Sequence, residues 1–167
     1  MTTDTTLETT TETDTTRPEP QWITPQVRAG LVAGTATQVQ VRAGAHDWTI
    51  DEPAGLGGTD LGANPVEHLL GSLGACQVIT FQVWAEKLGL TLDAVDVDLS
   101  GDIDLRGFFG LDPEARPGFD QVRAEVRLTG PESKEAYDEL VAVVEEHCPV
   151  LDSIGARVPV STQVTVA

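Results

Sequence analysis

Two cysteines are the residues of this chain whose chemistry is simplest to define. Cys76 and Cys148 lie far apart and belong to no CxxC pair, so the sequence has neither a zinc-ribbon nor a thioredoxin-type redox motif. Each falls on or at the end of a predicted helix, and packing of the two helices could bring the thiols together. In a reducing cytoplasm, a disulfide between them is more often transient and catalytic than structural. The pattern alone fits inert core positions better, because a buried cysteine behaves as a small hydrophobe.

The first cysteine belongs to a helix predicted over residues 64–89. Asn64 can cap this helix, Pro65 suits its first position, and Glu67 can reach back to the amide of the capping residue. Gly89 provides its end. An apolar stripe recurs inside the helix at steps of three and four residues: Leu69, Leu73, Cys76, Thr80 and Val83. The stripe predicts that Cys76 faces the interior of the protein.

Two glycines, Gly71 and Gly74, lie inside the same helix. Each costs up to about 1 kcal/mol relative to alanine at such a position, so each needs a structural reason. Close approach of another backbone is the usual reason. We therefore expect a neighbouring element to pass close to this part of the helix.

The remaining segments predict an α+β fold. Segments in which apolar and polar residues alternate are typical of strands, and they occur in adjacent pairs rather than singly between helices. The expected elements are a hairpin over 35–42 and 47–50, strands over 95–104 and 121–128, a helix over 132–147 and a closing strand over 158–166. The last helix should break at Pro149, with Cys148 at the start of a new helical turn.

Loop residues provide weaker candidates for a site. Asp51, Glu52 and Asp60 could suggest a metal or phosphate site, but their spacing matches no calcium loop and the nearby glycines match no phosphate-binding motif. We interpret them as solvated loop charges. Phe108 and Phe109 lie in a long predicted loop, where they could line a pocket or form a minor satellite core.

The histidines do not predict a metal site. His68 lies two turns from Cys76 and points about 80° away from it on the helix, so one ion could not easily bind both. His147, beside Cys148, is the other candidate. We expect Phe81 and Trp84, on the same helix as His68, in the core or in a dimer interface.

The composition predicts one domain and a tail. The 167 residues are 40% hydrophobic, which suits a single globular domain over residues 21–167. Residues 1–20 are rich in threonine and acidic residues and predict a disordered tail. We found neither a signal sequence nor an apolar run long enough to span a membrane, so we expect a soluble cytoplasmic protein.

The formal net charge of −17 limits the partners of this protein. Nucleic acid is not expected among them, because little in the chain could neutralise phosphates. The charge is typical either of a protein adapted to high salt or of an ordinary acidic bacterial protein.

Three sequence segments together resemble the OsmC/Ohr family, the osmotically inducible and organic-hydroperoxide-resistance proteins. They are DEPAGLGG, GANPVEHLLGSLGAC and HCPVLDSIGARVPV, and the resemblance extends over about residues 35–166. It implies an OsmC-like α+β fold in which two central helices are wrapped by antiparallel sheets in an intertwined homodimer.

The resemblance also implies a reaction. Cys76 would be the peroxidatic cysteine, which attacks an organic hydroperoxide and becomes a sulfenic acid. Cys148 would resolve it as a disulfide, and a dithiol reductant, such as a lipoylated protein, would restore both thiols. No cofactor is implied.

The family places an arginine and a carboxylate at the reactive thiol. Arg42 is the matching candidate for the arginine, which would favour the thiolate near neutral pH, and Arg28 is a second one. The carboxylate departs from the family pattern, because Val66 follows the Asn-Pro pair and Glu67 comes one position later. Nine residues separate Glu67 from Cys76, so they fall on opposite helix faces about 13 Å apart along the axis. Glu67 could assist that thiol only across a dimer or after a local distortion, and a capping role suits it better.

Two alternatives to a peroxidase stay open. One is a non-catalytic OsmC-like protein that binds an apolar ligand in the cavity between subunits, which Val66 in place of the usual acid favours. The other treats both cysteines as core residues that take part in no reaction.

Overall fold

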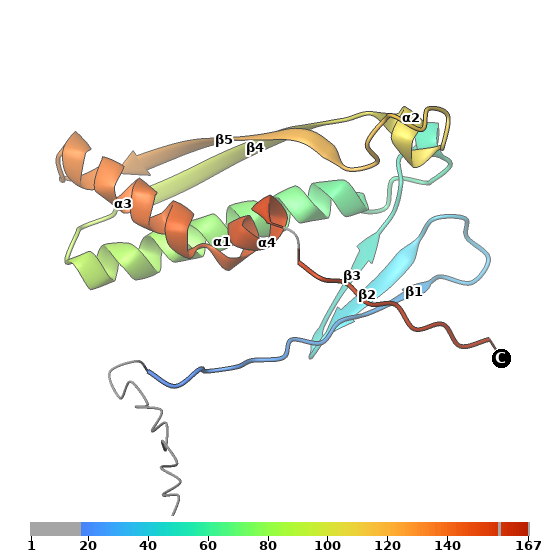
Figure 1. Cartoon of the computed structure of the whole chain (residues 1–167), viewed down its shortest axis with the longest axis horizontal. Helices are drawn as coiled ribbons and strands as arrows, with labels where there is room; N and C mark the ends of the chain where they lie inside the picture. Colours follow the sequence, from blue (N-terminus) through green and yellow to red (C-terminus); the bar gives the residue numbers. More distant parts are fainter. Residues whose placement is uncertain (1–17, 157, 167) are drawn as a thin grey trace, which may run out of the picture.

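A long helix lies along a two-stranded antiparallel sheet, and two further helices pack beside it (Figure 1). A small three-stranded sheet stands near one end of the long helix. This computed structural model describes residues 18–156 and 158–166. The tail expected over residues 1–20 therefore lies outside the described residues, except for 18–20, which are exposed and belong to no helix or strand.

The element order confirms the α+β class. The first elements are strands β1 (Arg28–Leu31), β2 (Val39–Ala43) and β3 (His46–Ile50) and the 3-10 helix η1 (Ala54–Leu56). They are followed by α1 (Pro65–Leu88), β4 (Ala94–Ile103), α2 (Leu105–Phe108), β5 (Phe119–Thr129), α3 (Lys134–His147) and α4 (Pro149–Gly155). All strand pairs in the described residues are antiparallel. Among the helices that the structure describes, none combines the length and apolarity that crossing a bilayer requires.

Both ends of α1 form as the sequence predicts. The Asn64 side chain accepts hydrogen bonds from the amides of Val66 and Glu67, and the Glu67 carboxylate accepts one from the Asn64 amide at 2.8 Å. Gly89 ends the helix in the left-handed region with φ of 69°. Because capping depends on neighbouring residues alone, the sequence suffices to place these ends.

The buried face of α1 overlaps the predicted stripe only in part, because Leu73 and Thr80 of the stripe are buried and Leu69 and Val83 are not. Its buried residues are Leu73, Gly74, Gln77, Thr80, Phe81 and Ala85. Leu69 and Val83, which the stripe placed inside, are 40% and 43% exposed. The core is centred instead on Phe81, which packs against α3 and the β4–β5 sheet. The helix is therefore turned so that the edge of the stripe carrying Cys76 stays partly open to solvent.

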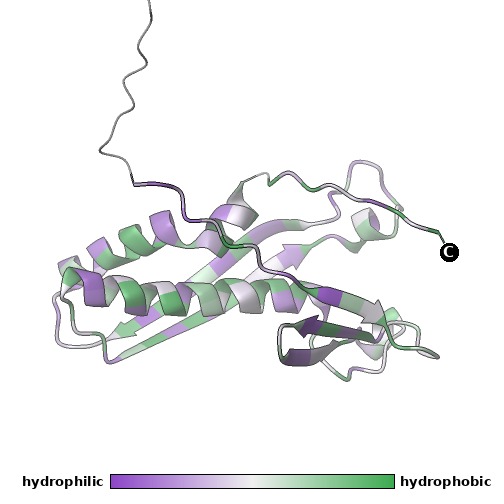
Figure 2. Ribbon diagram, turned by 90° about the horizontal axis from the view of Figure 1, so that it is seen from below, coloured by the Kyte–Doolittle hydropathy of each residue, from purple (hydrophilic) through white to green (hydrophobic). Residues whose placement is uncertain are grey.

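The β4–β5 sheet has one polar face. Its register runs from Ala94 opposite Thr129 to Ile103 opposite Phe119. Figure 2 shows hydrophobic and hydrophilic residues alternating along these strands, as the sequence predicts for a sheet with one buried face. Two ion pairs on the exposed face link the strands: Arg123 with Asp102 and Arg127 with Asp98.

The predicted hairpin is part of a three-stranded sheet. β2 begins at Val39, and Thr35, the expected start, lies in the connecting loop. β1 is fully exposed and has no alternating pattern, so the sequence did not indicate it. β1 places Arg28 opposite Arg42, and Arg42 in turn lies opposite Asp47 of β3. These three charged residues form one row across the sheet.

No strand forms over residues 158–166, where the sequence predicts one. Figure 1 shows this segment leaving α4 as irregular chain. Its apolar side chains are exposed, among them Val160 at 88% and Val166 at 90%. A strand needs a neighbour for its amide and carbonyl groups, and no described strand of this chain pairs with the segment. The prediction is therefore wrong for the single chain.

Asp51 is a buried hydrogen-bond centre and not the solvated loop charge that we predicted. Its side chain is 1% exposed and accepts from the hydroxyls of Thr37 at 2.6 Å and Thr59 at 2.7 Å. The amides of Glu52, Thr59 and Leu61 also donate to it. The hydrogen bonds from Thr37 and Thr59 hold the pKa of Asp51 well below its ordinary value, although burial opposes this. The carboxylate thus ties the loop that leads into α1 to the segment before β2.

Close packing accounts for Gly74 but not for Gly71. A Cβ at Gly74 would lie 3.0 Å from Cδ1 of Leu99 in β4, whereas a Cβ at Gly71 would meet no described atom within 4 Å. We expect Gly71→Ala to raise the free energy of unfolding by about 0.5–1 kcal/mol through helix propensity. Gly74→Ala should raise the free energy of unfolding by less, because the Leu99 side chain must shift to make room for the new methyl group. Urea unfolding followed by circular dichroism compares the two, and a destabilised Gly71→Ala would contradict the expectation.

Candidate active site

Cys148 lies at the joint between α3 and α4. Its amide donates to the Val144 carbonyl at 2.9 Å, and its carbonyl accepts from the Asp152 amide at 3.0 Å, so it ends one helix and begins the next. Pro149 occupies the first position of α4, where its missing amide hydrogen costs nothing. The predicted helix break is confirmed, and the Cys148 side chain is fully buried within it.

Cys76 lies in the middle of α1, where its thiol interacts with that of Cys148. Burial is the main cause that raises the pKa of Cys148, and the Cys76 thiol raises it further as a hydrogen-bond partner and as a charge. The amides of Leu151 and Val150 act in the opposite direction. Both thiols are free, and Cys76 is partly exposed. The packing of α1 against α3 and α4 thus brings together two cysteines that are distant in the sequence.

The two thiols differ in what they can do. The partly exposed Cys76 can meet a molecule from solvent. Buried Cys148, with its raised pKa, stays protonated at neutral pH. Oxidation of Cys76 to a sulfenic acid would put an electrophilic sulfur next to the Cys148 thiol. The arrangement can therefore close a disulfide between elements that are already in contact.

Arg42 is engaged elsewhere within the single chain. Its guanidinium pairs with Asp47 at 2.6 Å on the exposed side of the small sheet. Their hydrogen bond raises the pKa of Arg42 and lowers that of Asp47. Arg28, the second candidate, lies beside Arg42 across the strand pair. Among the described residues that shift the pKa of Cys148, there is no arginine or lysine.

Glu67 closes the N-terminal cap of α1. Its carboxylate bonds to the Asn64 amide, its side chain is exposed, and it lies nine residues before Cys76 on the same helix. This spacing directs it away from that thiol. Val66, which follows the Asn64-Pro65 pair, is 39% exposed and lines two cavities.

Two of the three histidines, His68 and His147, lie beside tryptophan rings. The His68 ring centre lies 6.4 Å from that of Trp48, and the His147 ring centre lies 4.2 Å from that of Trp84. Lys87 Nζ lies 4.2 Å from the centre of a Trp84 ring. In the part of the chain that the structure describes, no group of three or more histidine, cysteine or acidic side chains could hold a metal ion.

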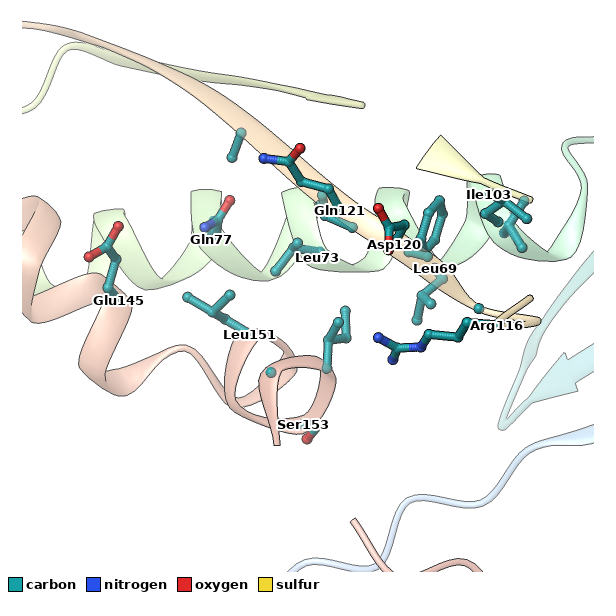
Figure 3. Close-up of a pocket in the computed structure, with 17 residues that line it drawn as sticks. Leu69, Leu73, Gln77, Ile103, Arg116, Asp120, Gln121, Glu145, Leu151 and Ser153 are labelled. Atoms are coloured by element: carbon teal, nitrogen blue, oxygen red, sulfur yellow. The ribbon is translucent and has the colours of Figure 1, made fainter. Parts of the chain in front are cut away.

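Cavities open beside α1. One of about 780 Å³ lies between α1, the β4–β5 sheet and α4 (Figure 3). Another of about 460 Å³ lies at the N-terminal end of α1, where Phe108 and Phe109 line it with their rings 5.0 Å apart. Lining a pocket was one of the two roles predicted for these phenylalanines.

The sequence did not indicate two polar residues of the larger cavity. Gln77 is 6% exposed, and its Oε1 has no hydrogen-bond partner among the described residues. Arg116, between α2 and β5, points its guanidinium into the cavity (Figure 3). A polar residue at a core-facing helical position is the signal that could have revealed Gln77, but the predicted stripe was turned away from it.

Solved structures of low sequence identity share this fold. The OsmC-like protein from Mycoplasma pneumoniae is 18% identical and has a TM-score of 0.70, with 80% of this chain and 88% of that chain covered. The organic hydroperoxide resistance protein OsmC from Legionella pneumophila is 23% identical with a TM-score of 0.62, covering 81% of this chain and 91% of that one. An organic hydroperoxide resistance protein from Elizabethkingia anophelis is 20% identical with a TM-score of 0.61, covering 81% and 90%. No curated protein matches the chain in sequence.

The family follows from the sequence profile that the chain matches. The profile described as OsmC-like protein covers residues 57–163, well over half of the chain. This range contains α1, the β4–β5 sheet, both cysteines and the joint between α3 and α4. The chain therefore belongs to the OsmC-like protein family.

Proposed function

We propose that this protein reduces organic hydroperoxides with the pair Cys76 and Cys148. The observation that carries the proposal is the interaction of a partly exposed thiol with a buried one at the joint of α3 and α4. Membership of the OsmC-like family supports it, as do structural neighbours that are named organic hydroperoxide resistance proteins. The proposed compartment is the cytoplasm, where reducing conditions keep both thiols free between turnovers.

The reaction begins with attack by the Cys76 thiolate on the terminal oxygen of the hydroperoxide. The oxygen–oxygen bond breaks, the alkoxide leaves and takes up a proton to become an alcohol, and Cys76 becomes a sulfenic acid. The Cys148 sulfur then attacks the Cys76 sulfur. A disulfide forms, and the hydroxyl of the sulfenic acid leaves as water with the Cys148 proton. An external dithiol, such as a lipoylated protein, reduces the disulfide by exchange and becomes oxidised itself.

Activation of the thiol is proposed to need a second copy of the chain. A thiol on an apolar helix face requires a nearby cation to ionise near neutral pH. Within one chain Arg42 is held by Asp47 on the small sheet. We therefore assign Arg42, with Arg28 as the alternative, to approach Cys76 from the small sheet of a second copy. Glu67 could assist only from such a position as well.

Exposed apolar surface supports a homodimer. The outer side of α1 exposes Leu69, Ile79 and Val83, and the segment over 158–166 exposes its valines. Unpaired segments of this kind bury their surface by pairing with another chain. We expect the full chain to be a dimer and deletion of residues 158–167 to leave mostly monomer. Light scattering coupled to size exclusion measures both masses, and a monomeric full chain would contradict the homodimer.

A thiol count tests the proposed reaction directly. One equivalent of cumene hydroperoxide should consume both thiols of the reduced protein, because each turnover ends in one disulfide. Alkylation followed by mass spectrometry counts the thiols before and after. Two thiols that stay unmodified by the peroxide yet react with the alkylating reagent after unfolding would refute the reaction.

A second candidate function is non-catalytic binding of an apolar ligand. The cavity of about 460 Å³ favours it, because Val66, Phe108 and Phe109 line it and Val66 stands in place of an acid. This function predicts a ligand retained through purification, together with native thiols that do not react with alkylating reagents. Mass spectrometry of a denatured extract would identify such a ligand.

A further inference from the structure

The segment before β1 is an exposed arm with large apolar side chains. Residues 20–27, which we call the N-terminal arm, belong to no helix or strand, and every residue over 18–31 is exposed. Trp22 is 88% exposed, Ile23 85% and Val27 62%. Aromatic residues of this kind are enriched in protein interfaces, because they bury a large apolar area. The arm therefore has the composition of a segment that binds another surface.

A second exposed apolar surface lies on α2 and the turn that follows it. Phe108 and Phe109 are 69% and 54% exposed, and Leu105 and Leu111 beside them are 45% and 74% exposed. We call these four side chains the α2 surface. The cavity of about 460 Å³ opens next to Leu105, Phe108 and Phe109, and Val66 of α1 also lines it. Exposed apolar side chains gathered in this way mark a site of interaction.

Ion pairs and hydrogen bonds hold the α2 surface in its outward-facing arrangement. Arg106 pairs with both Asp104 and Asp112, and the Leu111 amide donates to the Arg106 carbonyl at 2.9 Å. A Cβ at Gly107 would lie 2.6 Å from the backbone of the segment that leads into β5, so the turn packs closely on that segment. The polar groups of the turn thus pair within it, while its apolar side chains face solvent. A surface fixed in this way loses little conformational entropy when a partner binds.

The charges of the arm and of the α2 surface are complementary. Residues 20–46 contain no aspartate or glutamate and two arginines, Arg28 and Arg42, in a chain with 27 acidic residues. Acidic side chains outnumber basic ones around α2, where Asp102, Asp104, Asp112, Glu114 and Asp120 lie with Arg106 and Arg116. The acid-free segment can therefore approach α2 without the repulsion that most of the chain would meet there.

The arm and α2 lie on opposite sides of the molecule. Figure 1 shows the arm below the helices, leading away from β1, and α2 above them, near the N-terminal end of α1. The end of the arm is fixed, because β1 pairs with β2 from Arg28 to Leu31. The arm is therefore placed to meet a second copy of the chain and not the α2 surface of its own copy.

We propose that the N-terminal arm of one copy docks on the α2 surface of a second copy, with Trp22 in the cavity of about 460 Å³. The indole lies against Phe108 and Phe109, where it buries about 150–250 Å². The arm thereby covers Val66 and fills the cavity that the second candidate function assigns to an apolar ligand. The proposal goes beyond the peroxidase function and rests on the proposed homodimer alone.

Cross-linking between isotopically distinct chains tests which surface the arm meets. Trp22 is replaced by p-benzoylphenylalanine, an aromatic residue that reacts with neighbouring C–H bonds on irradiation. Dimers are assembled from equal amounts of isotopically labelled and unlabelled full chain, and mass spectrometry of a digest identifies the joined peptides. We expect the replaced residue to be joined to residues 105–111, in pairs that include one labelled and one unlabelled peptide.

Two pairs of variants test the contact without a cross-linker. Trp22→Ala should raise the dissociation constant of the dimer on the order of a hundredfold, because each dimer loses two such contacts. Gln21→Ala, which changes an exposed polar residue of the arm, should leave it unchanged. Phe108→Ser should weaken the dimer as Trp22→Ala does, whereas Leu88→Ser, at the other end of α1, should not. Phe109→Ser is a second variant should Phe108→Ser disturb folding. Sedimentation equilibrium measures the constants.

Cys76→Ser separates this inference from the peroxidase function. The variant should lose hydroperoxide reduction and keep both the dimer and the cross-link, because Trp22 and the α2 surface are unchanged in it.

Three results would overturn the proposal. Cross-linked pairs that never mix labelled with unlabelled peptide would place the arm on its own chain. Cross-links to Ile79 or Val83 would assign the arm to the outer side of α1. Equal dissociation constants for Trp22→Ala and Gln21→Ala would show a dimer that forms without the arm.

Discussion

Cys76→Ser should abolish hydroperoxide reduction, with a loss of about a thousandfold or more in rate, because the variant has no nucleophile at that position. Cys148→Ser should instead stop after the first step. Its Cys76 can still be oxidised, but no second thiol lies beside it to form the disulfide. Single-turnover consumption of cumene hydroperoxide, measured with each variant and a dithiol reductant, distinguishes the two blocks.

The chemical state of Cys76 in these variants tests the order of the steps. In Cys148→Ser, one equivalent of hydroperoxide should give a sulfenic acid on Cys76 that dimedone traps, whereas the unchanged protein should give a disulfide and no adduct. Thermal unfolding of both variants serves as the control for folding, since Cys148 is fully buried. Full activity in Cys76→Ser would show that Cys76 is not the nucleophile. A dimedone adduct on Cys148 in the unchanged protein would reverse the roles of the two cysteines.

The parts of this site that local sequence specifies could be predicted. Asn64, Glu67 and Gly89 place the ends of α1 through hydrogen bonds within a few residues, and Pro149 places the joint between α3 and α4 in the same way. Alternating apolar residues identify β4 and β5, because each has one face against the core. The proximity of Cys76 and Cys148 follows once both helices are placed and packed together.

The parts that depend on distant contacts could not be predicted. The buried face of α1 is set by α3 and the β4–β5 sheet, which cover Gln77 and Phe81 and leave Val83 exposed. A single helix of mixed hydrophobicity does not reveal which of two adjacent faces its neighbours will cover. β1 has no buried face, so it lacks an alternating pattern. The segment over 158–166 has the alternating pattern, but no described strand of the chain pairs with it. The pattern therefore predicts a strand that the single chain does not form.

The surroundings of Arg42 also depend on distant contacts that the sequence does not reveal. The sequence places it at the end of a strand, and the structure adds its neighbours Arg28 and Asp47 in one row of the small sheet. Arg42 and Asp47 form an exposed ion pair, and such pairs contribute little to the stability of a fold. If Arg42 is the cation that activates Cys76, as proposed, it has to exchange Asp47 for the thiolate. Measured thiol ionisation in the monomeric deletion variant would separate activation within a chain from activation across the dimer.

Asp51→Asn should be one of the most destabilising single changes in the loop that leads into α1. The carboxylate accepts hydrogen bonds from two threonine hydroxyls and three amides, whereas an asparagine offers one oxygen and directs an amide group at donors. We expect Tm to fall on the order of 10 °C at neutral pH. Differential scanning calorimetry at fixed protein concentration measures the change. Asp47→Asn is the matched control, because it removes a carboxylate from an exposed ion pair, and it should shift Tm by no more than a few degrees.

The same variant has a pH dependence whose sign follows from the pKa of Asp51. Folding lowers this pKa, so the unfolded chain binds the proton more readily and protonation favours unfolding. The stability that the carboxylate contributes is therefore complete above its ordinary pKa of about 4 and is lost as the pH falls below that value. Asp51→Asn lacks this titration, so its Tm should approach that of the unchanged protein as the pH is lowered from about 6 to about 3. A Tm difference that stays constant over this range would show that Asp51 stabilises the loop by shape and not as a buried carboxylate.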